Sequence, residues 1–216
     1  MQLNKKKTEV MIFNFTRDYQ FCTRLYIEDS LIQTVRETKL LGTIISSDLK
    51  WHSNTEMIVK KTYQRMIILH KLCSFSMPDS ELVDIYILYL RSILEQSCQV
   101  WHHAITEEEK SDLERVQKVA CKVILGSRYT DYQSALETLN LDRLDQRRAE
   151  LCLRFAKKCL KYPQTKDMFP LNTEQQVNTR DAATYKVKFA NTGRLMDSAI
   201  PQLQRALNED AKLKSK

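Results

Sequence analysis

Acidic side chains are considered first, because paired carboxylates could hold the metal ions of a phosphoryl-transfer enzyme. Such chemistry needs closely placed carboxylates that bind two divalent ions. The sequence has no adjacent Asp-Asp pair, and its acidic runs lie at residues 28–29, 107–109 and 209–210. These positions are expected in a turn, a helix start and a tail, and negative charge is favourable at a helix start. We therefore expect no catalytic residues and no metal ligands among them.

Cysteine and histidine could form a different metal site. Cys98 and His102 have the i, i+4 spacing that places two zinc ligands on one helix face, and His103 follows. No further ligand has matching spacing, so we interpret the three as packing and surface residues. The six cysteines include no CxxC pair, which favours buried thiols in a reducing compartment. An iron-binding His-x-Asp motif and a glycine-rich methyltransferase turn are both missing from the sequence.

The composition favours a mainly helical protein with a basic surface. The 216 residues are 43% hydrophobic and include only three glycines and four prolines, so long helices meet few breakers. The net charge of +7 suits a polyanionic partner without proving one. The first seven residues are polar and basic, so we expect no secretion signal, and no run is long and apolar enough for a membrane span. We expect a cytoplasmic or nuclear protein.

The pattern of apolar residues predicts an α+β fold with three regions. Residues 1–52 contain four short β-type runs, at 10–15, 22–27, 31–35 and 40–45, which we interpret as an antiparallel meander. Residues 53–163 have helical periodicity, with helices expected to about residue 74, at 80–103, from the capping box Thr106 and Glu109 to Gly126, at 131–139 and at 142–161. Residues 164–216 are polar and are expected to form a loosely structured tail.

Two basic stripes on the expected helices could contact phosphates. One lies on the first helix, and the other follows one side of the helix at 142–161 beside an apolar face. Charged helix faces are often only solvated, so both interpretations stay open. Trp51 and Trp101 are expected to be core anchors rather than base-stacking platforms. The stripe residues are Lys60, Lys61 and Arg65, then Arg143, Arg147, Arg154 and Lys158.

A set of short segments follows one order along nearly the whole chain. The segments are 3–8 (LNKKKT), 39–42 (KLLG), 48–51 (DLKW), 90–95 (LRSILE), 100–101 (VW), 113–118 (LERVQK), 132–139 (YQSALETL), 147–148 (RR) and 198–201 (SAIP) before 207–208 (LN). No single segment is specific, but the ordered set resembles the C-terminal palm and thumb of reverse transcriptases from non-LTR (LINE-type, jockey-like) retrotransposons.

The resemblance implies a palm remnant with a primer-grip hairpin, a helical thumb and a tail. Lys7 would lie near an incoming triphosphate, and Lys39, Leu40, Leu41 and Gly42 would form the hairpin that holds the primer. Lys7 is equally well read as a surface lysine and Gly42 as an ordinary hairpin glycine.

In this family the carboxylates for Mg²⁺ come from an aromatic-Ala-Asp-Asp turn, and this sequence lacks such a turn. The resemblance therefore implies a truncated RNA-directed DNA polymerase that keeps at most binding of an RNA template and primer duplex. The alternative is a helical module that binds only protein, using the exposed part of the helix at 80–103.

Overall fold

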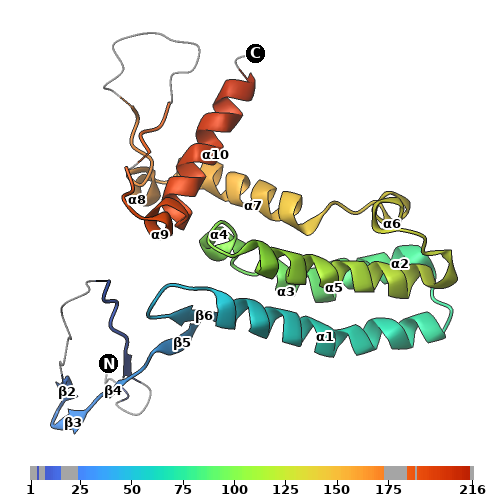
Figure 1. Cartoon of the computed structure of the whole chain (residues 1–216), viewed down its shortest axis with the longest axis horizontal. Coiled ribbons are helices and arrows are strands. Elements are labelled where there is room, and N and C mark those ends of the chain that lie inside the picture. The colour runs from blue at the N-terminus through green and yellow to red at the C-terminus, as the bar shows by residue number, and fades with distance from the viewer. Residues whose placement is uncertain (1–3, 5–7, 16–23, 173–183, 188, 215–216) are drawn as a thin grey trace. The chain divides into compact units, whose positions relative to one another are not determined.

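The structure is a computed structural model that describes residues 4, 8–15, 24–172, 184–187 and 189–214 (Figure 1). The chain divides into two compact units, Met1–Met57 and Ile58–Lys216. The division falls inside helix α1 (His52–Ser74), which begins directly after Trp51. The described elements confirm the α+β class, because short strand pairs precede a series of helices.

The strands of the first unit are shorter than expected and do not form one meander. Among the described residues they form three separate two-stranded pairs. Pair β2–β3 (Tyr26–Ile27 and Ser30–Leu31) and pair β5–β6 (Glu37–Leu40 and Thr43–Ser46) are antiparallel. Strand β1 (Glu9–Val10) pairs with β4 (Gln33–Thr34) in parallel, so the prediction of an all-antiparallel sheet was wrong at this pair.

Two tight turns explain where the antiparallel strands end. Glu28 and Asp29 both have positive φ angles, and so do Leu41 and Gly42. Positive φ at both central residues is the property of a type I′ turn, whose twist matches that of a two-residue hairpin. The expected strand at 40–45 is therefore interrupted by the turn at 41–42, which brings Leu40 opposite Thr43.

The hairpin is attached to the start of α1 by side-chain hydrogen bonds within the first unit. The Ile44 amide donates to Asn54 Oδ1 at 3.0 Å, and the Ser53 hydroxyl donates to Glu37 Oε1 at 2.6 Å. Between strand and helix, Asp48 accepts from the Ser46 hydroxyl and the Lys50 amide, and these bonds hold the pKa of Asp48 below its usual range. The first turn of α1 therefore positions the hairpin backbone.

The predicted helix at 80–103 is real but is not continuous. Helix α2 (Asp79–Ile85) passes into a π-helical turn, η2 (Tyr86–Arg91), and then into α3 (Ser92–Leu94). Ser97 has a left-handed conformation with φ 54°, and α4 (Cys98–Trp101) begins after it. Left-handed backbone cannot continue an α-helix, so the chain turns here. Trp101 is fully buried, as expected of a core anchor, and Trp51 is also buried.

Helix α5 (Glu107–Leu125) begins at the predicted capping box and ends at the predicted glycine, whose backbone conformation differs from the one expected. The Glu109 amide donates to Thr106 Oγ1 at 3.2 Å, and the Thr106 amide donates to Glu109 Oε2 at 2.7 Å, which confirms the capping box. Gly126 follows with φ 53° and ψ −124°. This conformation resembles the first central position of a type II′ turn rather than the left-handed cap expected, and it favours glycine. The short helix η3 (Gly126–Arg128) completes the turn.

Helices α6 (Tyr132–Leu139) and α7 (Leu144–Cys159) lie where the sequence predicts them. The Asp131 carboxylate caps α6 by accepting from the Ser134 amide. Helix α7 ends at Cys159, two residues before the expected end at residue 161. Pro163 occupies the first position of α8 (Pro163–Lys166), where its missing N–H costs nothing.

The prediction of a loose tail was wrong for the end of the chain. Helix α10 (Ala199–Lys214), preceded by the single turn α9 (Gly193–Met196), packs against α7 and α4. Leu203 and Leu207 are buried, and Lys157 of α7 pairs with Asp210 at 2.6 Å. Asn208 also holds the extended backbone at Tyr185, accepting from its amide at 2.8 Å and donating to its carbonyl at 3.0 Å. Two leucines one turn apart were too few to reveal this packed face in the sequence.

None of the described helices is both long and apolar enough to cross a membrane. The longest, α1, carries charged residues along its length.

Candidate nucleic-acid interface

The hairpin β5–β6 presents the residues predicted to hold a primer. Leu41 at its tip is 90% exposed although leucine is apolar, and its φ of 49° is one that a leucine side chain disfavours. Lys39 and Leu40 on the adjoining strand are also exposed. Gly42, with φ 91°, supplies the second turn position. The tip therefore combines an exposed apolar side chain with a nearby cation. Lys7, the remaining predicted residue of the first unit, lies outside the described residues.

The basic stripe predicted on α1 is only partly free to bind a ligand. Lys60 is exposed, and Lys61 is half-buried. The Arg65 guanidinium lies 4.4 Å from the centroid of the Tyr89 ring and donates to the Tyr89 carbonyl at 3.2 Å. These contacts join α1 to η2 and explain Arg65 as a structural residue.

The basic stripe on α7 also contains both residues held by ion pairs and residues that are exposed. Arg143 pairs with Asp145 at 3.1 Å, which raises the pKa of Arg143. Arg147 pairs with Glu95 at 2.8 Å, and Glu95 also lies 3.5 Å from Arg91. Arg154 and Lys158, in the second half of the helix, are exposed. The second half of α7 is therefore the part of the stripe that is available to phosphates.

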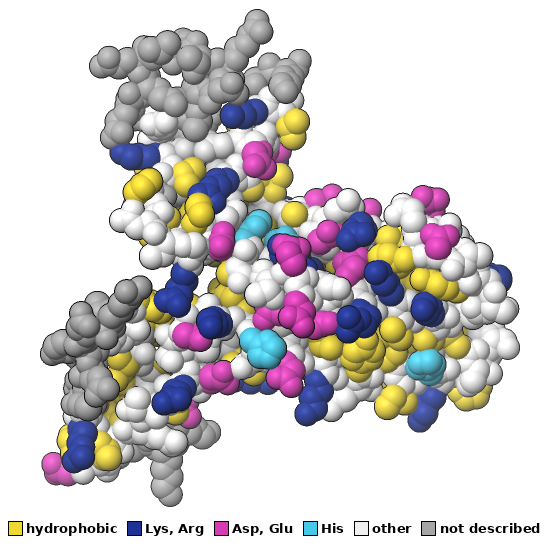
Figure 2. All heavy atoms as spheres, in the orientation of Figure 1, with side chains coloured by type: hydrophobic (Ala, Val, Ile, Leu, Met, Phe, Trp, Pro, Cys, Tyr) yellow, Lys and Arg dark blue, Asp and Glu magenta, His cyan; other side chains and the backbone are white. Residues whose placement is uncertain are grey.

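A third group of basic residues lies on α5 and was not singled out in the sequence. Arg115, Lys118 and Lys122 are all exposed and fall within about 60° of each other on a helical wheel. Lys118 lies 5.1 Å from the centroid of the Tyr132 ring, and Lys122 lies 5.2 Å from that of Tyr129. We call these five residues the α5 cationic surface. Lys and Arg side chains are visible over the second half of α5 in Figure 2.

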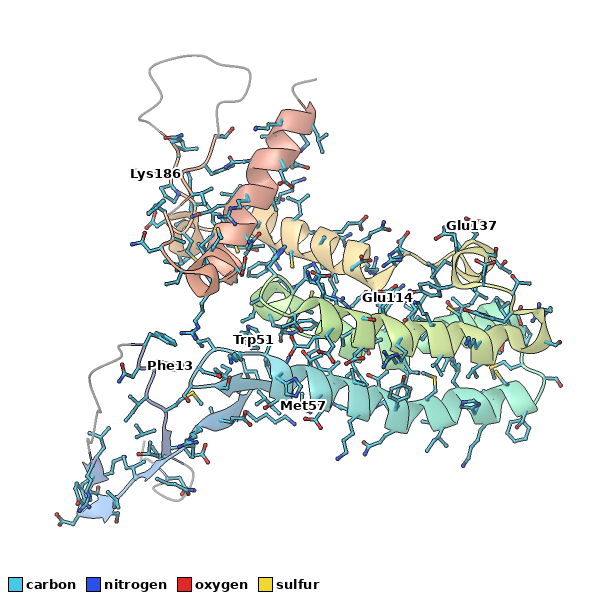
Figure 3. The ribbon with its side chains drawn as sticks, viewed as in Figure 1. Phe13, Trp51, Met57, Glu114, Glu137 and Lys186 are labelled. Atoms are coloured by element: carbon cyan, nitrogen blue, oxygen red, sulfur yellow. The ribbon has the colours of Figure 1, made fainter. Side chains whose placement is uncertain are left out.

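A buried polar network fixes one aromatic ring of this surface. The Tyr132 hydroxyl donates to Glu114 Oε1 and accepts from Gln117 Nε2 at 2.9 Å. Burial and the Glu114 carboxylate raise the pKa of Tyr132. Glu114, labelled in Figure 3, also accepts from the Leu144 amide at 3.4 Å, which joins α5 to the start of α7. A ring held at its hydroxyl end keeps a fixed face for the Lys118 ammonium.

Arg148 lies inside the helical unit rather than on its surface. Its side chain is fully buried, its guanidinium lies 5.7 Å from the Trp101 ring, and its Nε donates to His102 Nδ1 at 3.4 Å. The pKa of His102 is lowered to about 3, mainly by burial and to a smaller extent by the Arg148 charge. Burial likewise lowers the pKa of Arg148, and Nη1 and Nη2 have no hydrogen-bond partner among the described residues.

The geometry around Cys98 and the histidines differs from that of a zinc site. His102 Nδ1 accepts from Arg148, and the Cys98 carbonyl oxygen lies 3.8 Å from the Cys152 sulfur. Burial and the Lys110 charge lower the pKa of His103. Within the described residues, no cluster of three or more Cys, His, Asp or Glu side chains has the geometry to hold a metal ion.

The α5 cationic surface could have been found from the sequence by one signal. Arg115, Lys118 and Lys122 recur at the spacing of one helix face, as the two predicted stripes do. The tyrosines lie beyond Gly126, and only the turn there brings them back to α5. Sequence spacing alone could not have paired them with the lysines.

No protein-family model, curated protein or solved structure matches this chain.

Proposed function

We propose that the chain is a non-catalytic nucleic-acid-binding module derived from a retrotransposon reverse transcriptase, which holds an RNA template and primer duplex through phosphate contacts. The observation that carries the proposal is the α5 cationic surface. It places three exposed cations on one helix face. Arg115 also pairs with Asp112 at 2.9 Å, and the two lysine ammonium groups lie over tyrosine rings. Lysine and arginine neutralise phosphates and release counterions, and aromatic rings beside them can contact sugars or bases.

The rest of the chain supports the same function. Arg154 and Lys158 supply two further exposed cations on α7. The hairpin tip exposes Leu41 in a conformation that costs about 1–2 kcal/mol, and such strain is common where backbone approaches a ligand. The order of a hairpin, a tryptophan and a helical series is the order that the resemblance implies.

The proposal does not include polymerisation by these residues. Two-metal catalysis needs paired carboxylates, and the sequence has no Asp-Asp pair. Under this proposal the full-length polymerase would bind Mg²⁺ through carboxylates that this chain does not contain. Free buried thiols fit a reducing compartment, so we place the module in the cytoplasm or the nucleus.

A second candidate function rests on exposed apolar side chains. Phe75, directly after α1, is 79% exposed, and Leu88 in the π-helical turn is 75% exposed. Exposed apolar groups and π-turns both occur at interaction sites, so a protein-binding module is the competing function.

Salt dependence separates the two functions. We would measure binding of the full chain to a fluorescent RNA template annealed to a DNA primer, at several salt concentrations. Phosphate contacts predict that the logarithm of the affinity falls linearly with the logarithm of salt concentration. The double variant Lys118→Gln/Lys122→Gln removes two cations of the α5 cationic surface and should lower the slope by about 2.

The matched control is Lys71→Gln/Lys166→Gln, which removes the same charge from two exposed lysines elsewhere. Equal losses in both double variants would mean that only net charge matters, and would remove α5 as the interface. A flat salt response of the unmodified chain would overturn nucleic-acid binding and favour the protein-binding module.

A further inference from the structure

Cys98 and Cys152 form a buried pair of thiols that the proposed function does not use. Cys98 is the first residue of α4, and Cys152 lies in the middle of α7. Neither side chain has any exposed area. The Cys152 thiol lies 3.8 Å from the Cys98 carbonyl oxygen. The two cysteines therefore meet at the contact between α4 and α7.

The surroundings make the two thiols unequal. The hydrogen bond from Cys152 lowers the pKa of Cys98 despite its burial, and the Arg148 charge acts in the same direction. The same bond and burial raise the pKa of Cys152. By contrast, burial raises the pKa of Cys121, on α5, to about 12. Because the thiolate is the nucleophile, Cys98 is the thiol of the pair that reacts first.

We propose that Cys98 and Cys152 are a redox pair that a peroxide converts to an intramolecular disulfide between α4 and α7. The Cys98 thiolate attacks one oxygen of hydrogen peroxide, the O–O bond breaks, and the leaving hydroxide takes up a proton to become water. The Cys152 sulfur then attacks the Cys98 sulfenic acid, the S–O bond breaks, and the departing hydroxide takes the Cys152 proton as a second water. The two sulfurs lose two electrons, and one peroxide gains them.

The fold provides a route for a small oxidant to reach the pair. Helix α4 is four residues long and follows the left-handed Ser97, so its local opening breaks few helical hydrogen bonds but must also move the buried Trp101. Short elements of this kind open locally at lower cost than long helices. Hydrogen peroxide is small and uncharged, so brief opening of α4 is sufficient. The disulfide would then close the chain between residues 98 and 152, a loop that contains all of α5.

Peptide mapping of the full chain tests the proposal. The protein is treated with hydrogen peroxide, denatured with excess iodoacetamide and digested. We expect a reducible cross-link between the Cys98 and Cys152 peptides, lighter than the two thiol peptides by two hydrogen atoms, while Cys121 is alkylated. A rise in the unfolding temperature that dithiothreitol reverses should accompany the cross-link, because a covalent loop restricts the unfolded chain.

Control variants separate pairing from general oxidation. Cys121→Ser should keep the cross-link, whereas Cys98→Ser and Cys152→Ser should abolish it. If a serine variant does not fold, the map of the unmodified chain decides by itself. Alkylation of both Cys98 and Cys152 after peroxide treatment, a cross-link to another cysteine, or oxidation of Cys98 beyond the sulfenic acid without a cross-link would each overturn the proposal.

Discussion

The Tyr86 hydroxyl donates a hydrogen bond to the Gln117 amide oxygen at 2.5 Å, and both side chains are fully buried. The amide nitrogen of Gln117 in turn donates to the Tyr132 hydroxyl and to the Asp142 carbonyl, each at 2.9 Å. One glutamine on α5 therefore connects the π-helical turn η2, helix α6 and the loop before α7. The core of the helical unit depends on polar contacts as well as on packing.

Removing one hydroxyl from this network should destabilise the helical unit. In Tyr86→Phe the ring still fills its place, but the Gln117 amide oxygen loses its partner in a buried setting. A buried polar group left without a partner costs about 1–3 kcal/mol. We expect the free energy of unfolding in urea to fall by this amount.

The matched control is Tyr89→Phe. Tyr89 is partly exposed, and its contacts with Arg65 use the ring face and the backbone carbonyl, which phenylalanine keeps. This variant should change the unfolding free energy by no more than about 0.5 kcal/mol. Equal effects of the two substitutions would contradict the role assigned to the Tyr86 hydroxyl.

The buried His102 predicts that stability falls as the solution becomes acidic. Its pKa is about 3 in the folded protein against 6.5 in an unfolded chain, so between these values the unfolded state binds more protons. Stability therefore decreases as pH falls through 6.5 and the loss stops growing below about 3. Between pH 7 and pH 4.5 the contribution is on the order of 2 kcal/mol.

The substitution His102→Asn isolates this contribution. Asparagine does not titrate, and its side-chain oxygen can accept from Arg148 in place of the imidazole nitrogen. Urea unfolding of this variant should depend less steeply on pH between 7 and 4.5 than that of the unmodified chain. His70→Asn, at an exposed position, should leave the slope unchanged. An identical slope for His102→Asn would mean that folding does not lower the pKa of His102.

Local sequence signals such as capping residues and apolar periodicity predicted the positions of most helices. The box of Thr106 and Glu109 predicted the start of α5, and the helical periodicity expected from residue 53 agrees with the start of α1 at His52. Periodicity of apolar residues failed inside the second helix, because the left-handed turn at Ser97 has no distinctive residue type. It also could not detect Glu114, Gln117 or Arg148 as core residues, because buried polar residues look like surface residues until their partners are known.

Long-range pairing accounts for the other differences. The parallel pairing of Val10 with Thr34 joins segments far apart in sequence, which alternation in one strand cannot reveal. For the candidate site, helix spacing identified exposed cations such as Arg154 and Lys158. It could not show that Arg65 and Arg147 are engaged by partners from other elements, Tyr89 and Glu95.

Gly126 should resist substitution because of its backbone rather than its surroundings. A Cβ atom added there would meet no other atom within 4 Å, so Gly126→Ala causes no clash. Its φ of 53° with ψ of −124° is disfavoured for alanine and should cost about 1–3 kcal/mol of unfolding free energy.

Gly193 lies in α9 without a positive φ, so Gly193→Ala should be neutral or stabilise by up to about 1 kcal/mol. Thermal and urea unfolding of the two variants show whether each substitution lowers or raises the free energy of unfolding. A neutral Gly126→Ala would mean that the turn after α5 adopts another conformation.

Arg147 and Arg154 occupy the same helix, and we predict opposite consequences of replacing them. Arg147 pairs with Glu95, whose side chain is 15% exposed, so Arg147→Gln leaves a partly buried carboxylate with Arg91 as its remaining ion-pair partner in the described part of the chain. This should destabilise the fold by about 1–2 kcal/mol. Arg154 is exposed, and Arg154→Gln should alter the unfolding free energy by less than about 0.5 kcal/mol.

For binding to the RNA–DNA duplex we expect the opposite, with a larger effect of Arg154→Gln than of Arg147→Gln. Under the proposed function Arg154 can reach a phosphate and Arg147 is held by Glu95, so Arg154→Gln should weaken binding and lower its salt slope by about 1. Arg147→Gln, assayed where it is fully folded, should bind as the unmodified chain does. A larger loss of binding for Arg147→Gln would show that the ion pair with Glu95 opens to release this guanidinium to the duplex.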